Sequence, residues 1–422
     1  MNIYLRQART MIGQHKLFST IYIVGTALSV MLTMSVIILT YIKVAPLYPY
    51  NQRNMMLEMT SLRIELPGKA EFADRNVQMG RLSYSLAERL KTLKGVSYIG
   101  TKTKPNKGQL SLPNNLQATT ATYVYTDAGF WDVFKFKFLS GKAYGEADIL
   151  RASSDIVISE SLAKRMFGAS EIAGRQILFN GMLRRVAGVV ADVSAFVSEP
   201  YAEVWLPASP QMLQNKATKA SEKLFGTWDV YLLTSDKKQA QQSIADFFKR
   251  LNTSQKEFQV DLRMLAESAN FEMTGDEFNY ATLILLGILV VGLLVIPSLN
   301  LSSLISSRME KRLPEMGIRK AFGARRSTLL WQVMVENVLL TAIGSLIGLL
   351  LAYVLVVSNA SALRSMLTQT GDDPIITIEM LFNPWIILFT ILVCLTVNIL
   401  AAVVPGCLSL RRNIVDSLNL KK

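Results

Sequence analysis

Four long apolar stretches dominate the sequence. They cover residues 17–42, 280–307, 327–363 and 381–410, and a single carboxylate, Glu336, interrupts the third. A helix needs about 20 apolar residues to cross a bilayer, so each stretch is long enough to span one. Segment 44–280, between the first two, is far more polar. We therefore expect a membrane α-helical protein with four transmembrane helices, one before and three after a large extracytoplasmic domain.

The positive charge of the chain is concentrated beside these stretches. The formal net charge is +13, yet residues 44–280 carry 29 Lys and Arg against 25 Asp and Glu, so most of the excess lies elsewhere. Basic residues flank transmembrane helices on the cytoplasmic side. A nucleic-acid-binding protein would instead gather them on one folded face among aromatic residues. We therefore expect the lipid bilayer as a partner and no nucleic acid.

The same charges predict the topology. The N-terminal segment, the 306–326 loop and the C-terminal tail are basic, whereas the 358–384 loop carries one basic residue, Arg364, against three acidic ones. Positive charge on the cytoplasmic side places both termini and the 306–326 loop in the cytoplasm. Residues 44–280 are then periplasmic or otherwise extracytoplasmic, and the protein is multi-pass in the inner (cytoplasmic) membrane.

Segment 44–280 is expected to form an α+β domain of two subdomains. Strands at 55–65 and 96–103 with a helix at 83–94 precede an insert, about 127–210. A strand at 228–233, a helix at 235–251 and a strand at 258–264 follow it, so this outer part is split by the insert. Within the insert, short strands alternate with one helix at 159–167, and the aromatic run 130–136 is predicted as a buried strand. Residues 264–280 are expected to form a stalk helix.

Several enzyme classes are excluded by the residues present. His15 is the only histidine, so a histidine-based zinc site, a Ser-His-Asp triad and a Cys-His dyad are ruled out within one chain. A phosphate-binding loop needs G-x-x-x-x-G-K-[ST], and the nearest fragment, 140–143, reads SGKA and lacks both the first glycine and the hydroxyl. We expect a non-catalytic subunit without cofactor or metal, with ATP hydrolysis on a partner chain.

Three segments carry a resemblance to a known family. Residues 309–326 read MEKRLPEMGIRKAFGARR, residues 155–168 read DIVISESLAKRMFG, and residues 403–420 read VVPGCLSLRRNIVDSLNL. Together with the arrangement of one span, a large domain and three spans, they resemble the FtsX/MacB-type permease family of ABC transporters, and the match covers essentially the whole chain. Ile414 stands where that family usually has proline. The resemblance implies a MacB-like periplasmic core domain and an FtsX-like permease region at about 281–415.

The resemblance also implies a role for the 306–326 loop. Pro314 suits the first turn of a helix, Glu315 favours its dipole, and Gly323 can end it. By resemblance this is the helix that couples the permease to its ATPase, and the alternative is a basic loop contacting lipid headgroups. The candidate coupling residues are Pro314, Glu315, Met316, Gly317, Ile318, Arg319, Lys320, Ala321, Phe322, Gly323 and Ala324.

Two polar or small-residue features lie inside the apolar stretches. Glu336 and Asn300 would reach a similar depth on antiparallel helices, where they could form an interhelical hydrogen bond. A proton or substrate relay is the alternative role of Glu336. Gly344, Gly348 and Ala352 form a small-residue stripe that allows close helix packing, either within the subunit or between two copies.

The resemblance therefore implies a permease subunit that couples ATP hydrolysis on a separate chain to extracytoplasmic work by mechanotransmission, such as export or lipoprotein release. It also implies a second permease copy or homologue and a periplasmic adaptor as partners. Two alternatives stay open: an FtsX-like regulatory permease that activates a wall hydrolase, and a membrane-anchored binding module. The predicted domains are a cytoplasmic interfacial helix (1–16), transmembrane helices (17–43, 281–305, 327–357, 385–408), the extracytoplasmic domain (44–280), the coupling loop (306–326), an outer loop (358–384) and a tail (409–422).

Overall fold

The computed structural model describes residues 16–66, 77–214, 217–255, 257–260, 284–295, 307, 318, 322–323, 326–360, 362 and 382–411. The chain divides into two compact units. One is helical and contains 1–41, 280–360 and 376–422; the other contains 42–279 and 361–375. The predicted interfacial helix, apart from Lys16, and the predicted stalk helix lie outside the described residues.

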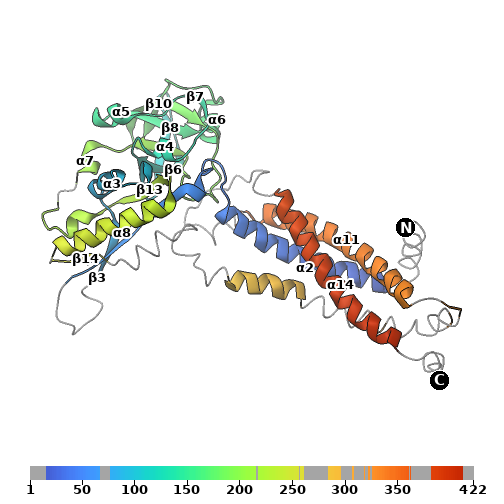
Figure 1. The fold of residues 1–422 in the computed structure, drawn as a ribbon. Coiled ribbons are helices and arrows are strands. Elements are labelled where there is room, and N and C mark those ends of the chain that lie inside the picture. Colours follow the sequence, from blue (N-terminus) through green and yellow to red (C-terminus); the bar gives the residue numbers. More distant parts are fainter. Residues whose placement is uncertain are drawn as a thin grey trace. The chain divides into compact units, whose positions relative to one another are not determined.

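The helical unit contains α2 (Lys16–Val44), a shorter helix (Ile284–Val295), α11 (Arg326–Ser358) and α14 (Pro384–Arg411) (Figure 1). Three stretches are long and apolar enough to cross a membrane: Lys16–Ile42, Trp331–Ser358 and Pro384–Ala401. Of the predicted second span, only 284–295 falls among the described residues, and it is an apolar helix.

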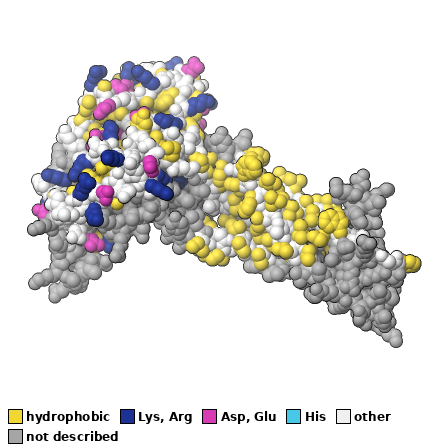
Figure 2. Space-filling view, in the orientation of Figure 1, with side chains coloured by type: hydrophobic (Ala, Val, Ile, Leu, Met, Phe, Trp, Pro, Cys, Tyr) yellow, Lys and Arg dark blue, Asp and Glu magenta, His cyan; other side chains and the backbone are white. Residues whose placement is uncertain are grey.

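Helix α2 has an unusual distribution of side chains. Its exposed face is apolar and carries Ile21, Val24, Leu28 and Leu32, whereas its buried face mixes apolar side chains such as Val30 and Met34 with Thr26, Ser29 and Thr33. A helix at the surface of a soluble protein instead exposes a charged or polar face to water. In Figure 2 the visible described surface of the helical unit is predominantly hydrophobic, and the Lys, Arg, Asp and Glu side chains gather on the other unit. Both observations fit a bundle surrounded by lipid.

The second unit is built on a mixed sheet of 14 strands. Its main path runs β11-β8-β10-β9-β5-β6-β4-β13-β3-β2-β14, with β1 beside β13, β12 beside β3 and β7 beside β10. The strands are β1 Met56–Met59, β2 Leu62–Glu65, β3 Val77–Leu82, β4 Val96–Thr103, β5 Asn106–Leu112, β6 Asn115–Thr126, β7 Phe138–Gly141, β8 Asp155–Ser159, β9 Gln176–Phe179, β10 Met182–Val190, β11 Val204–Pro207, β12 Phe225–Gly226, β13 Trp228–Thr234 and β14 Gln259–Val260.

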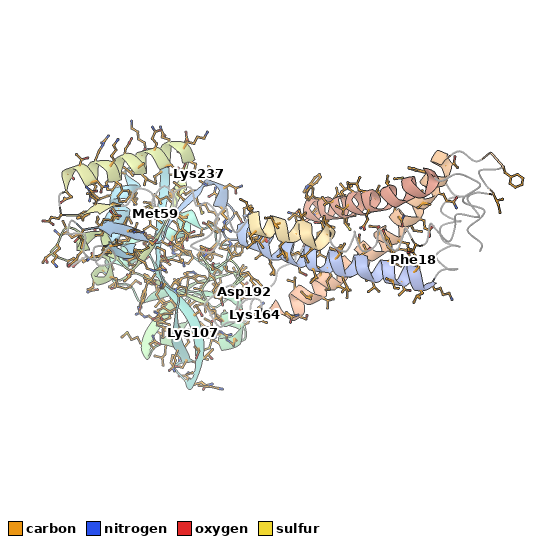
Figure 3. The ribbon with its side chains drawn as sticks, turned by 90° about the horizontal axis from the view of Figure 1, so that it is seen from below. Phe18, Met59, Lys107, Lys164, Asp192 and Lys237 are labelled. Atoms are coloured by element: carbon orange, nitrogen blue, oxygen red, sulfur yellow. The ribbon has the colours of Figure 1, made fainter. Side chains whose placement is uncertain are left out.

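A first hydrophobic core lies between the strands around β13 and two helices, α3 (Tyr84–Lys91) and α8 (Lys237–Ser254). Leu86 and Leu90 of α3 and Ile244 and Phe248 of α8 are buried in it. Met59 of β1 belongs to the same core, whereas the Lys237 ammonium donates a hydrogen bond to the Asn54 carbonyl at 3.1 Å (Figure 3). The helices therefore close one side of this part of the sheet.

A second core lies around β8, β10 and helix α6 (Glu160–Phe167). Ile156, Ile158, Val186 and Val189 form its centre, and Leu110 and Ala121 join it from β5 and β6. The short helices α4 (Phe130–Val133), α5 (Glu146–Leu150) and α7 (Pro210–Leu213) and the 3-10 turns Arg53–Met55 and Glu222–Leu224 complete the described elements.

Most of the predicted elements of this unit are confirmed, including β4, β8, α3, α6, α8 and β13. The predicted strand at 130–136 is wrong, because residues 130–133 form α4. Phe130 and Val133 are nonetheless buried, as that prediction required. The single strand predicted at 55–65 is two strands, since β1 pairs with β13 and β2 pairs with β3.

Candidate functional site

The candidate coupling segment is described at three of its positions. Ile318 and Phe322 have exposed fractions of 50% and 89%. The Phe322 N–H donates to the Ile318 carbonyl at 3.0 Å, which is the hydrogen bond of one α-helical turn. Gly323 follows with φ +87, a left-handed conformation that suits glycine after a helix. The other candidate residues, Pro314, Glu315, Met316, Gly317, Arg319, Lys320, Ala321 and Ala324, lie outside the described residues.

Glu336 lies in the interior of the helical bundle. Its exposed fraction is 3%, and that of its neighbour Asn337 is 4%. A carboxylate at such a position costs free energy in lipid, and an interior position of this kind reduces the cost. Asn300, its predicted partner, lies outside the described residues, so the proposed pair stays a prediction.

The small-residue stripe of α11 faces α2. A Cβ atom at Gly344 would lie 2.8 Å from the Cβ of Thr26, and one at Gly348 would lie 2.5 Å from the carbonyl oxygen of Ala27. Ala352 is fully buried. At Gly344 and Gly348, therefore, the close approach is between two helices of the same subunit.

Polar side chains that the sequence analysis did not single out link the helices. Tyr22 Oη and Thr341 Oγ1 lie 3.1 Å apart, and Ser29 Oγ donates to the Leu293 carbonyl at 2.6 Å. On the other side of α11, Ser345 Oγ lies 3.8 Å from Cys394 Sγ of α14. Interhelical hydrogen bonds of this kind hold transmembrane helices together. Single serines and threonines within apolar runs do not predict such hydrogen bonds, because these residues are tolerated on either face of a transmembrane helix.

The sheet unit contains a buried charged network. Glu58 of β1 stands opposite Tyr231 of β13, and Lys102 of β4 lies 3.9 Å from Asp229 of β13. Burial raises the pKa of Glu58, and the nearby Glu199 carboxylate raises it further. Burial lowers the pKa of Lys102, against the effect of the Glu199 and Glu58 carboxylates. The network joins β1, β4 and β13 to the loop that carries Glu199.

Two family models match the chain in succession. The MacB-like periplasmic core domain matches residues 19–247, which is more than half of the chain, and the FtsX-like permease C-terminal region matches residues 269–414. The chain belongs to the FtsX/MacB-type permease family of ABC transporters. The family assignment from the sequence motifs is thereby confirmed. As a member of this family, the protein is an ABC transporter permease with membrane helices and a MacB-like α+β periplasmic domain.

The curated relatives are distant, and those named MacB are longer than this chain. The macrolide export ATP-binding/permease protein MacB of Neisseria meningitidis is 25% identical over 334 residues, which are 76% of this chain and 49% of the relative. The uncharacterized ABC transporter permease YknZ of Bacillus subtilis is 24% identical over 273 residues, 63% of this chain and 64% of that protein. The chain thus spans about half the length of the MacB relatives that it matches.

Among solved structures, the periplasmic region of MacB from Actinobacillus actinomycetemcomitans aligns with a TM-score of 0.34 and 20% identity, covering 52% of this chain and 96% of that one. The extracellular domain of YknZ aligns with a TM-score of 0.33 and 17% identity, covering 48% of this chain and all of that domain.

Proposed function

We propose that this permease subunit couples ATP hydrolysis by an ATPase outside these 422 residues to work done by its extracytoplasmic domain. The observation that carries the proposal is the succession of the two family matches, the periplasmic core domain at 19–247 and the permease region at 269–414. The relative MacB is named an ATP-binding/permease protein, so its name joins both functions in one protein. The present chain corresponds to about half of such a relative and has no phosphate-binding loop.

The proposed topology has four spans, at 17–43, 281–305, 327–357 and 385–408, in the inner (cytoplasmic) membrane. Both termini and the 306–326 loop are cytoplasmic, and the extracytoplasmic domain comprises two subdomains within 44–280. Three apolar helices and the apolar helix Ile284–Val295 support the four spans, and two separate hydrophobic cores support the two subdomains. The positive charges beside the helices support the orientation.

In the proposed mechanism, residues 314–324 dock into a groove of the ATPase. Phe322 supplies the central apolar contact, because its side chain is 89% exposed on a helical turn next to a basic segment. At interfaces a few anchoring side chains, often aromatic, carry most of the binding free energy. Closure of the ATPase would push this helix, and the first two spans would carry the movement to the extracytoplasmic domain. A second permease copy or homologue completes the complex, and a periplasmic adaptor is a further proposed partner.

The test is association with an ATPase in native membranes. The tagged full chain is purified, and a copurifying subunit is identified by photolabelling with an azido-ATP analogue. Phe322→Ala should reduce the amount of that subunit by about tenfold or more. Phe382→Ala is the matched control, because Phe382 is also an exposed phenylalanine but lies in the proposed outer loop. Absence of a photolabelled subunit, or equal recovery with both variants, would overturn the proposal.

A further inference from the structure

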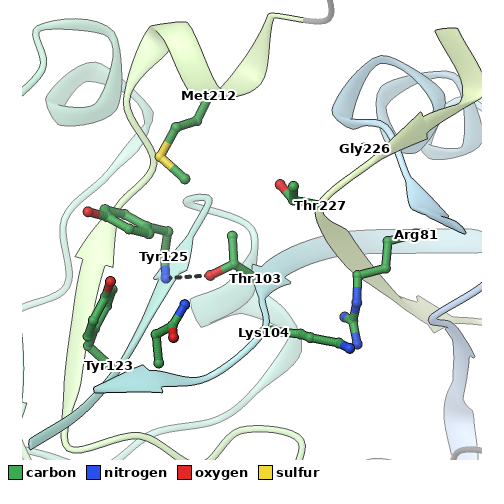
Figure 4. Close-up of a pocket in the computed structure, with 9 residues that line it drawn as sticks. Arg81, Thr103, Lys104, Tyr123, Tyr125, Met212, Gly226 and Thr227 are labelled. Carbon is green, nitrogen blue, oxygen red and sulfur yellow. Dashed lines mark hydrogen bonds between the residues drawn. The ribbon is translucent and has the colours of Figure 1, made fainter. Parts of the chain in front are cut away.

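A pocket of about 500 Å³ lies within the sheet unit, lined by residues of β3, β4, β5, β6, β12 and α7. Arg81 of β3 and Gly226 of β12 line one side, and Tyr123 and Tyr125 of β6 line the other (Figure 4). Met212 of α7 closes the pocket from above in this view. A volume of this size is typical of small-molecule sites, which fall between roughly 300 and 1,000 Å³.

One end of this pocket is cationic. Arg81 and Lys104 both line it, and Figure 4 shows the Lys104 side chain extending toward the Arg81 guanidinium. Two cations that point toward each other repel, unless an anion lies between them. Among the described residues that line the pocket, none is Asp or Glu.

The protein fixes one of these cations from behind. Arg81 forms an ion pair with Asp229, whose side chain is only 4% exposed. Asp229 Oδ2 also lies 3.9 Å from Lys102 Nζ, so one buried carboxylate forms ion pairs with two cations. Within the described part of the chain, Lys104 has no acidic partner. The pocket therefore holds a positive charge on Lys104 that its own lining does not neutralise. Beside it lies the Arg81 guanidinium, which Asp229 holds in position before any ligand binds.

The other end of the pocket offers flat and polarisable surface. The rings of Tyr123 and Tyr125 stand perpendicular, with centroids 5.7 Å apart. Thr103 Oγ1 accepts a hydrogen bond from the Tyr125 N–H at 3.0 Å, which ties β6 to the end of β4. The Met212 thioether faces these rings across the opening (Figure 4). Tyrosine and methionine together favour an aromatic or aliphatic body.

A second hollow extends the site. It has a volume of about 320 Å³ and shares Met212, Gly226 and Thr227 with the first. Tyr84 and Trp228 line its far side, and the described residues around it again include no Asp or Glu. An elongated ligand could therefore continue past Met212 along described residues that include no Asp or Glu, up to Tyr84, which is hydrogen-bonded to Glu88.

We propose that this pocket binds a small organic anion with an apolar body. The anionic group, a carboxylate or sulfonate, lies between Arg81 and Lys104, and the body lies against Tyr123, Tyr125 and Met212. Because the lining comes from β3, β6, β12 and α7, a bound ligand would contact elements that are far apart in the sequence. This ligand site is independent of the ATPase contact proposed above.

The experiment uses the full chain in lipid nanodiscs with carbon-13 label on the methionine methyl groups. The Met212 signal is assigned with Met212→Leu, and 2-naphthoate is titrated at measured free concentrations. We expect a saturable shift of the Met212 signal. Lys104→Gln should raise the dissociation constant by about fivefold, the effect of losing one partly exposed ion pair. Lys142→Gln, an exposed lysine outside the pocket, should leave the dissociation constant unchanged.

A second probe separates charge recognition from hydrophobic adsorption. The cation 2-naphthylmethylamine has nearly the same apolar body, and it should bind several-fold more weakly than 2-naphthoate. The proposal is overturned if the amine binds as tightly as the carboxylate, if Lys104→Gln leaves the dissociation constant of 2-naphthoate unchanged, or if 2-naphthoate produces no saturable shift.

Discussion

Gly348 of α11 lies so close to Ala27 of α2 that a Cβ atom at Gly348 would stand 2.5 Å from the Ala27 carbonyl oxygen. One turn earlier, a Cβ at Gly344 would meet the Thr26 side chain and the Ile23 carbonyl. Small residues allow transmembrane helices to approach this closely, and the packing and hydrogen bonds gained there hold the helices together. The first and third proposed spans are therefore in close contact at these two glycines.

Replacing Gly348 with leucine should separate these helices. We expect the free energy of unfolding to fall by about 1–3 kcal/mol, the range for overpacking a close contact. Gly287→Leu is the control, because a Cβ at Gly287 has no described neighbour within 4 Å. Denaturation of the detergent-solubilised chain, followed by circular dichroism, measures both. Equal stability of the two variants would contradict the close contact.

Asp155 and Arg185 predict a dependence of stability on pH. They are register partners on β8 and β10, and their side chains form a two-pronged ion pair at 2.5 and 2.6 Å. The hydrogen bonds from Arg185 hold the pKa of Asp155 below its usual value of 3.8. This contribution to stability is therefore present above the unfolded pKa and is lost as pH falls through the folded one.

Arg185→Gln should lower the free energy of unfolding only slightly at pH 7, because the arginine side chain is 60% exposed and solvent weakens its ion pair. The difference from wild type should shrink below about pH 4, as Asp155 becomes protonated. Arg184→Gln, the neighbouring residue, serves as the control and should show no such convergence. Thermal unfolding between pH 3 and 7 measures all three proteins, and a difference that is independent of pH would disprove the assignment.

Those structural features were predictable that produce a continuous pattern along the amino-acid sequence. The apolar runs, the strand–helix alternation and the single carboxylate Glu336 all stand out from their surroundings. The helix α4 does not, because residues 130–136 are rich in aromatic residues, which are typical of strands. Its formation depends on Asp127, whose carboxylate accepts hydrogen bonds from the Phe130 and Thr101 N–H groups at 2.9 Å. Thr101 lies on another strand, so this contact exists only after folding.

The functional features were predictable only in part, as the fold was. Gly344 and Gly348 were identified from their spacing, but their partner helix was not, because small-residue stripes carry no information about what covers them. The pocket around Arg81 and Lys104 left no signal at all. Its lining residues come from separate strands and helix α7, and only the sheet order brings them together.

Substitutions of Glu336 test whether its carboxylate has a structural role or takes up and releases protons. If its interactions only hold the helices together, Glu336→Gln should keep transport and cost less than about 1 kcal/mol of stability, whereas Glu336→Leu should cost more. Asn300→Ala combined with Glu336→Leu should cost less than the sum of the two single changes if the two residues pair. A Gln variant that is stable but inactive would instead indicate a proton or substrate relay, and strict additivity would exclude the pair.

The most direct test asks whether nucleotide binding at the ATPase reaches residues 44–280. Hydrogen exchange of this segment is measured in the purified complex, first without nucleotide and then trapped with ATP and vanadate. We predict altered exchange in the wild-type complex and in Gly292→Phe, a control whose Cβ position has no described neighbour within 4 Å. Gly317→Phe, in the coupling segment, should retain the ATPase but lose the response. Exchange that is unchanged by trapping, or a full response in Gly317→Phe, would contradict coupling through residues 314–324.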